Sequence, residues 1–378
     1  MSTSITLNWN HENPKEIYSR QLSECPLYWH DETDTWVTYS YEYCKAILLN
    51  PDAHIPEPVI TASSWLSDRA RLLVNNLARL SNGHQHAEAR NAAMRVYKYM
   101  RPVSIAKLME ALLKGVDPNS EFDYVEVIGK KLPVLIILKG LGFFGPECKY
   151  ITDHVGKLVK IMSPAIKKEE IAEINKVVDE FYHISEIYIK ANRLVIDPDL
   201  TAEKCTQLFI CNLVGLFIQS YDAGRALLCN TLLNMVDPIR GRNLDNPDYC
   251  RKFVIENLRL DTPVHNTRRI AVNDIAIGGK VIKAGQKILI TVGAANLDEQ
   301  IFKDPLAFDP SRSNNNDNLT FGIGGHMCLA KHLMIDMAVE ACSYLHDKYP
   351  QMNVLPQEFT YEPPVNVRMI KKMMIKLA

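Results

Sequence analysis

The residues of this chain best suited to chemistry lie between Phe321 and Ala330, where three glycines precede Cys328. Glycines permit a tight backbone turn and the close approach of a flat cofactor. The pattern predicts that Cys328 opens a helix, whose unpaired N–H groups lower the pKa of a thiol and stabilise a metal-bound thiolate. The alternative is a glycine-rich hairpin followed by a helix with a buried cysteine. Cys328 alone does not decide between the two.

Two other patterns place charged groups where they need a partner. Glu256 and Arg259 are three residues apart and share one helix face, so they form either a buried carboxylate–guanidinium pair or a solvated surface pair. Asp222 lies in an almost entirely apolar helical stretch, residues 206–233. A buried aspartate is costly without a task or a partner, and a salt bridge to an arginine is its structural alternative.

Taken in order, these motifs resemble those of the cytochrome P450 family. Phe321, Gly324, Cys328 and Ala330 fill the family's haem-loop pattern F-x-x-G-x-x-x-C-x-G/A. Upstream, Glu256 to Arg259 match the family's E-x-x-R helix. Phe308 to Arg312 match the segment whose arginine completes the Glu/Arg cluster, and Asn296-Leu297-Asp298 match the N-R-D element with leucine in the middle. The resemblance runs from about residue 62 to residue 341.

The resemblance implies haem b with Cys328 as the thiolate ligand of its iron, and with Phe321 and Gly322 beside the cofactor. Phe321 shields the sulfur from water, and donors to the sulfur tune the iron's potential. Buried propionates need cationic or N–H partners, and the residues that match the family's positions are His86, Arg90, Arg269 and His326. His84 is an alternative to His86, and Arg268 is an alternative to Arg269.

In the family, the central helix carries A-G-x-D/E-T, whose acid and threonine relay protons to bound dioxygen. Here the acid is kept as Asp222, but Ala223 occupies the threonine position. Ser220, Gln219, a water or a substrate hydroxyl then replaces the missing hydroxyl. Otherwise the enzyme couples phenols, desaturates, rearranges or uses peroxide, or the chain is a haem-binding carrier or recruiter without turnover.

The resemblance also implies a small organic substrate and an electron donor. The expected substrate contacts are apolar groups with a few donors, each apolar one with core packing as its alternative: Val59, Ile60, Trp65, Phe217, Val264, His265 and Thr267. The expected donor is a ferredoxin with its reductase, for which Arg95, Lys98 and Lys331 offer a basic docking patch.

The elements that must position these residues are mostly helices. Apolar residues recur at helical spacing in residues 170–192 and 206–233, and a helix is expected from Cys328 through Ala341. Short strands with a Gly-Gly turn are expected between Arg269 and Ile290. We therefore predict a mainly α fold with small β-sheets, as one domain over residues 1–378, with the haem between the central helix and the loop and helix of residues 321–341.

Composition limits the remaining possibilities. The 378 residues are 47% hydrophobic and 23% charged, which suits a globular protein. The net charge of −1 gives no electrostatic case for nucleic acid. No signal peptide and no apolar run long enough to span a bilayer is visible, and the nine cysteines form no CxxC. These features predict a soluble cytoplasmic protein that binds neither nucleic acid nor membrane.

Overall fold

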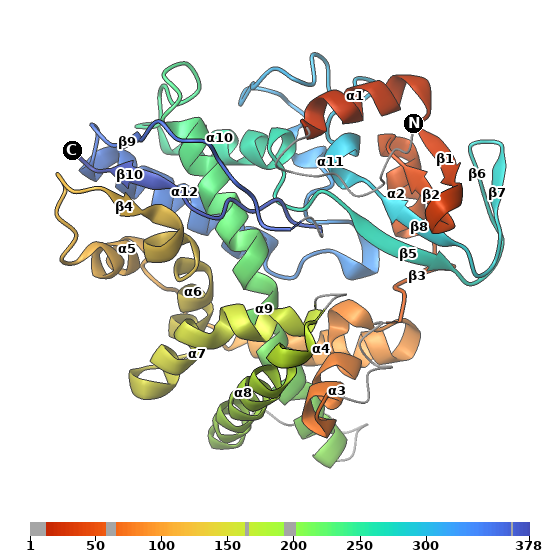
Figure 1. The fold of residues 1–378 in the computed structure, drawn as a ribbon, viewed down its shortest axis with the longest axis horizontal. Helices are drawn as coiled ribbons and strands as arrows, with labels where there is room; N and C mark the ends of the chain where they lie inside the picture. Colours follow the sequence, from red (N-terminus) through yellow and green to blue (C-terminus); the bar gives the residue numbers. More distant parts are fainter. Residues whose placement is uncertain (1–12, 58–65, 163–165, 193–201, 364–365) are drawn as a thin grey trace. The chain divides into compact units, whose positions relative to one another are not determined.

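The computed structural model describes residues 13–57, 66–162, 166–192, 202–363 and 366–378 (Figure 1). The chain divides into two compact units built from alternating segments. The first unit comprises residues 1–54, 105–129 and 223–378, and the second comprises residues 55–104 and 130–222. The division falls inside helix α9 (Ala202–Met235), which contains the predicted central helix.

Among its described residues, the second unit contains helices and the segments that connect them, but no strand. Its longest complete helix, α8, buries Ile174, Val177, Val178 and Phe181, the spacing that gives a helix one apolar face. Besides the first part of α9, the unit contains α3 (Asp68–Asn75), η3 (Ala78–Leu80), α4 (Gly83–Lys98), α6 (Leu132–Gly140), α7 (Gly145–Leu158), η5 (Val159–Met162), η6 (Lys168–Glu170) and α8 (Ile171–Ala191).

The first unit contains a five-stranded sheet in the order β1-β2-β8-β5-β3. Its strands are β1 (Leu27–His30), β2 (Thr35–Thr38), β8 (Lys287–Ile290), β5 (Thr267–Ala271) and β3 (Ala53–His54). Only the β2–β8 pair is parallel. On β8, Ile288 and Ile290 join one apolar cluster whereas Leu289 joins another. Since successive side chains of a strand point to opposite faces, the sheet is buried on both sides here, which explains the unbroken apolar run.

Two smaller sheets complete the β structure of the described residues. Strands β6 (Ile275–Ile277) and β7 (Lys280–Ile282) form the hairpin expected from the Gly-Gly turn. Both turn glycines have positive φ, 57° at Gly278 and 70° at Gly279, as a tight two-residue hairpin turn requires. The third sheet has the order β4-β10-β9, from Phe122–Asp123, Met374–Lys376 and Asn353–Val354.

The first unit's helices flank these sheets. They are α1 (Pro14–Glu24), α2 (Tyr41–Leu49), α5 (Ile105–Leu113), α10 (Pro247–Leu260), α11 (Val292–Ala295) and α12 (Lys331–Lys348), with short turns η1 (Asp31–Thr33), η4 (Val125–Gly129), η7 (Asn315–Asp317) and η8 (Gly324–His326). The sequence explains where helix α10 begins. Asn246 accepts hydrogen bonds from the amides of Asp248 and Tyr249, and Pro247 occupies the first helical position.

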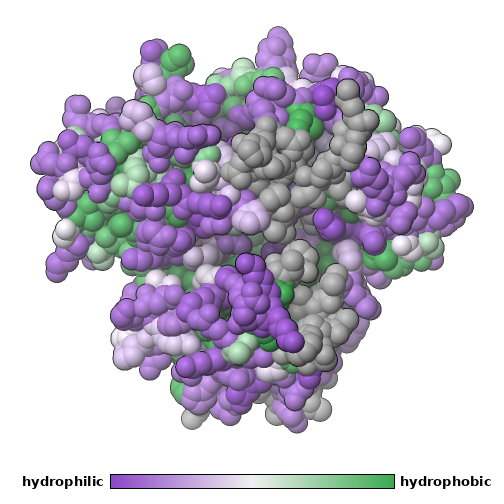
Figure 2. Space-filling model, viewed as in Figure 1, coloured by the Kyte–Doolittle hydropathy of each residue, from purple (hydrophilic) through white to green (hydrophobic). Residues whose placement is uncertain are grey.

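The architecture is the predicted one, helix-rich with small sheets. Among the helices that the structure describes, none is both long and apolar enough to cross a membrane. The face drawn in Figure 2 is mostly hydrophilic, with apolar side chains scattered between polar ones.

Candidate functional site

The glycine-rich loop turns the chain so that Cys328 lies beside Phe321. Gly322 and Gly324 have φ of 67° and 74°, a conformation that favours glycine. The amide of Cys328 donates to the carbonyl of Phe321 at 2.8 Å, and the amide of Met327 donates to that of Gly324 at 3.1 Å. Seven of the nine cysteines are buried, whereas Cys328 is partly exposed. The loop thus offers a thiol that a ligand can reach.

Helix α12 begins at Lys331, three residues after Cys328. The expectation that Cys328 opens the helix is therefore wrong, because a short 3-10 turn (η8) and a bend separate the glycines from α12. A helix's positive potential declines within its first turn. The backbone bonds of the loop, rather than a place inside α12, fix the position of this thiol.

The start of the loop is anchored to α10 by polar side chains. Thr320 donates from its hydroxyl to the carbonyl of Leu258 at 2.7 Å. Asn296 donates to the Thr320 hydroxyl at 2.9 Å and accepts from the amide of Leu319 at 2.7 Å. The hydroxyl oxygen of Thr320 and the side-chain amide nitrogen and oxygen of Asn296, which make these bonds, are buried. Thr320 was missed in the sequence analysis, and the N-L-D element containing Asn296 was the one available signal.

The structure brings Glu256, Arg259 and Arg312 into one buried cluster. Arg259 donates to both carboxylate oxygens of Glu256, at 2.6 and 2.7 Å, and neither side chain is exposed. Arg312 approaches the same carboxylate at 3.3 Å. Arg259 also donates to the carbonyls of Asn296 and Pro305 at 2.9 and 2.8 Å. The cluster therefore ties α10 to the segment that precedes the loop.

Arg269 is a buried cation in strand β5. Its side chain is 4% exposed, and it donates to the carbonyl of Arg268 at 2.8 Å and the hydroxyl of Thr267 at 3.2 Å. Burial lowers the pKa of Arg269 to about 10. No carboxylate lies in salt-bridge range of it among the residues that the structure describes. Arg268, its alternative, is exposed.

In the second unit, His86 and Arg90 lie one turn apart on α4. His86 is half-buried, and its Nδ1 lies 3.2 Å from the carbonyl of Ala78. Burial and then the charge of Arg90 lower the pKa of His86. His84, the alternative, is exposed and pairs with Glu88 at 3.6 Å. The local environment thus favours His86 over His84.

The polar residues of the central helix differ in how far they are exposed to solvent. Ser220 is buried and donates to the carbonyl of Phe217 at 3.0 Å. Gln219 is exposed and donates to the carbonyl of Gly215 at 3.1 Å. Asp222 and Ala223 are both partly exposed. Asp222 is therefore not sealed in the apolar core, contrary to the sequence-based concern about its burial.

The residues proposed as substrate contacts separate into three groups. Val59, Ile60 and Trp65 lie outside the described residues. Phe217 has no exposed surface and packs edge-on against Phe143 and Phe181, so it belongs to an aromatic core rather than a substrate pocket.

Near β5, His265 is buried and its Nδ1 lies 2.9 Å from the Tyr18 hydroxyl, so it too is a packing residue. Val264 and Thr267 are partly exposed, and Thr267 accepts from Arg269. These two remain available to a ligand.

The proposed basic residues are also distributed over both units. The Lys331 ammonium lies 6.0 Å from the centre of the Phe321 ring, beside the cysteine loop. Arg95 and Lys98 lie on α4 of the second unit, and Lys98 is exposed.

The donor set suits a haem. Cys328 is partly exposed, and beyond the neighbouring residues the nearest heavy atom to a Cβ built on Gly322 is the carbonyl oxygen of His326, at 3.9 Å. Arg269 is a buried cation that lacks an acidic partner among the described residues, as a propionate-binding arginine requires. His326 lies in the same loop and is partly exposed.

Comparison with known proteins gives consistent matches. Residues 230–335 match the family model described as cytochrome P450. The biotin biosynthesis cytochrome P450 of Bacillus subtilis is 24% identical over 96% of this chain and 95% of its own. Linalool 8-monooxygenase of Pseudomonas putida is 23% identical over 86% of each chain.

Solved structures show the same fold. CYP109E1 from Bacillus megaterium, in complex with testosterone, superposes with a TM-score of 0.82 at 23% identity, over 97% of this chain and 99% of that one. The matched residues of the family model include Glu256, Arg259 and Cys328. This chain is therefore similar to cytochromes P450 in sequence and has the cytochrome P450 fold.

Proposed function

We propose that this chain is a haem-thiolate monooxygenase or oxidase of a small organic molecule, with Cys328 as the ligand of the haem iron. The observation that supports this most directly is the loop itself. A partly exposed thiol follows two glycines with positive φ, and the loop is anchored through Thr320 to α10. The bound haem supplies dioxygen activation and the oxidation of the substrate.

The protein's own side chains hold the cofactor and manage protons. Arg269, with His326, His86 and Arg90, binds the propionates, since burial of these carboxylates needs cations or N–H donors. Phe321 covers the cysteine sulfur against water. The carboxyl of Asp222 holds the proton that the reaction consumes, and its partial exposure leaves it open to exchange with solvent.

The test is spectroscopic. Cys328→Ser is expected to abolish the red-shifted absorption band of the reduced carbon monoxide complex, because a hydroxyl does not replace a thiolate as an electron-rich ligand. Cys25→Ser is the matched control, since Cys25 is the other partly exposed cysteine, and it should leave the band unchanged. A purified protein that binds no haem would refute the proposal.

Ala223 favours a second candidate within this function: oxidation that does not need the usual threonine hydroxyl. Such chemistry includes oxidative coupling, desaturation and peroxide-driven reactions, and a chain without turnover would act as a haem-binding recruiter. A screen for substrate-induced spectral shifts, followed by turnover with either a ferredoxin system or hydrogen peroxide, separates these cases. Turnover with neither donor, for any molecule that binds, would favour the recruiter.

The proposed electron donor is a ferredoxin-type protein that docks near Lys331, with Arg95 and Lys98 as further contacts. Lys331 is supported best, because it lies against Phe321 of the cysteine loop. Reduction rates that do not change with salt or with replacement of any of the three by alanine would exclude this patch. All nine cysteines are free thiols, which supports a reducing compartment such as the cytoplasm.

A further inference from the structure

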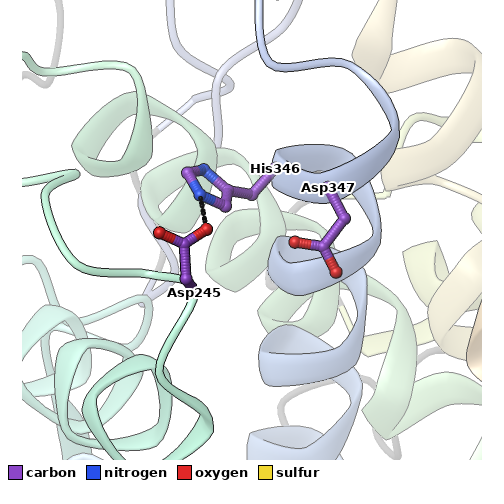
Figure 3. A group of neighbouring side chains, drawn as sticks. All are labelled: Asp245, His346 and Asp347. Atoms are coloured by element: carbon purple, nitrogen blue, oxygen red, sulfur yellow. Dashed lines mark hydrogen bonds and ion pairs between the residues drawn. The ribbon is translucent and has the colours of Figure 1, made fainter.

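Helices α10 and α12 are joined by a series of polar contacts in antiparallel order. At one end, His346 of α12 lies 2.9 Å from the carboxylate of Asp245, in the turn before α10 (Figure 3). At the other, Arg251 of α10 pairs with Asp336 of α12 at 2.7 Å. The two helices therefore run antiparallel to each other. Two buried cysteines, Cys250 and Cys342, meet between these surface pairs.

The Cys250 sulfur lies against the turn of α12 that carries Cys342. Its thiol donates to the carbonyl of Val339 at 3.8 Å, and the hydroxyl of Ser343 donates to it at 3.5 Å. The thiol of Cys342 donates to the sulfur of Met235 at 3.3 Å. Cys250 is 0% exposed and Cys342 is 3% exposed. Both sulfurs are thus held in place on neighbouring helices.

Their surroundings make the two thiols unequal. Interaction with Cys342, and then the Ser343 hydroxyl and the charge of His346, lower the pKa of Cys250 against the effect of burial. Interaction with Cys250 and burial raise the pKa of Cys342. By contrast, burial raises the pKa of Cys211 and of Cys229 to about 12. A thiol of lowered pKa beside a second thiol is the arrangement that favours disulfide formation.

We propose that Cys250 and Cys342 form a redox-active dithiol, which a two-electron thiol oxidant closes to a disulfide between α10 and α12. Diamide is such an oxidant and contains an N=N bond. The Cys250 thiolate adds to one nitrogen of this bond, and the other nitrogen takes a proton from solvent. The sulfur of Cys342 then attacks that of Cys250. The S–S bond forms, the S–N bond breaks, and the proton of Cys342 leaves with the hydrazine product.

The bridge would connect segments on either side of the candidate haem site. The chain between Cys250 and Cys342 contains Arg259, Arg269 and Cys328. A disulfide around such a long loop removes conformational freedom from the unfolded chain. This site is separate from the one that the proposed function uses, so the two stand or fall independently.

Peptide mapping of the haem-loaded full-length protein tests the proposal. The protein is reduced, freed of reductant, treated with diamide at neutral pH and quenched with acid, and its remaining thiols are alkylated after unfolding. We expect a peptide that links Cys250 to Cys342 within a monomeric chain, and a loss of two alkylated cysteines per chain. Dithiothreitol should reverse both changes.

The variants separate this pair from other cysteines. In Cys342→Ala no linked peptide should form, and Cys250 should be recovered as an alkylated thiol. Cys229→Ala, which removes a buried cysteine of high pKa, should leave the link intact. The measurement on the unmodified chain is decisive even where a variant fails to fold. Recovery of Cys250 and Cys342 as alkylated thiols after diamide, while Cys25 is oxidised, would overturn the proposal.

Discussion

Neighbouring arginines in strand β5 have opposite environments because side chains alternate across a strand. Arg269 is 4% exposed, whereas Arg268 points to solvent. The sequence alone left both open as propionate ligands, since two adjacent arginines do not reveal which one faces inward. In the structure Arg269 is buried opposite Ile288, whereas Arg268 is exposed although its partner Leu289 is buried, so the difference in burial favours Arg269.

Arg269→Met is expected to weaken haem retention. A hydrogen bond to a charged group contributes about 1.5–3 kcal/mol, so haem loss should be about 10- to 100-fold faster. The protein without haem should become more stable, because a buried cation without an acid is replaced by an apolar side chain. Haem transfer to apomyoglobin and thermal unfolding measure the two effects. Arg268→Met is the control, and equal haem loss in both variants would refute the assignment.

Asp222→Asn tests the proton relay. General acid–base groups typically contribute about 10²–10⁴-fold to a rate, so we expect turnover with dioxygen and a ferredoxin system to fall by about 100-fold. Turnover with hydrogen peroxide should fall much less, because peroxide brings its own protons. Glu203→Gln is the control, since Glu203 is an exposed acid on the same helix. An equal loss with both oxidants would indicate a structural role for Asp222.

At the scale of elements, periodicity predicts helices well but not where they begin. Residues 170–192 and 206–233 closely match α8 and α9, because one apolar face or a wholly apolar helix is visible in the sequence. The start of α12 was misplaced by three residues, since glycines and a following apolar run do not distinguish a 3-10 turn from an α-helix. The role of Thr320 depends on contacts with α10 that are distant in sequence.

The buried cluster that joins α10 to the loop should dominate local stability. Arg259→Ala leaves the Glu256 carboxylate buried with one guanidinium fewer, and breaking a buried pair costs about 3–5 kcal/mol. Arg251→Ala, one residue beyond Cys250 on the same helix, removes an exposed pair with Asp336 and should cost under about 1 kcal/mol.

Urea unfolding of both variants, followed by the haem absorption and by circular dichroism, provides the comparison. A similar loss of unfolding free energy in the two would contradict the difference in burial. A loss of haem absorption ahead of the circular dichroism in Arg259→Ala would indicate that the cluster chiefly supports the cysteine loop.

At the scale of the whole molecule, the ordered motifs predict the family and the mainly α architecture. The division into two units was not predicted, because each unit is assembled from separate segments and α9 contributes to both. No linker or shift in composition marks such a division. The contact of His265 with Tyr18 was not predicted for a related reason, since the two residues are 247 positions apart.

His265 should make the stability of the folded chain sensitive to acid. Burial, followed by the charge of Arg368, lowers the pKa of His265 from 6.5 to about 3. Between these values the unfolded chain binds a proton that the folded chain does not. The free energy of unfolding therefore falls as pH falls, by up to about 1.4 kcal/mol per pH unit.

The matched variant is His265→Gln, which keeps a hydrogen-bonding group beside Tyr18 but does not titrate. Between pH 7 and pH 5, the stability of the natural chain should fall by about 2 kcal/mol more than that of the variant. Urea unfolding of both proteins at the two pH values measures this difference, and other titrating groups cancel because the chains share them. Parallel pH dependence would mean that His265 is protonated in the folded protein, and the bond to Tyr18 would then have to be donated by the histidine.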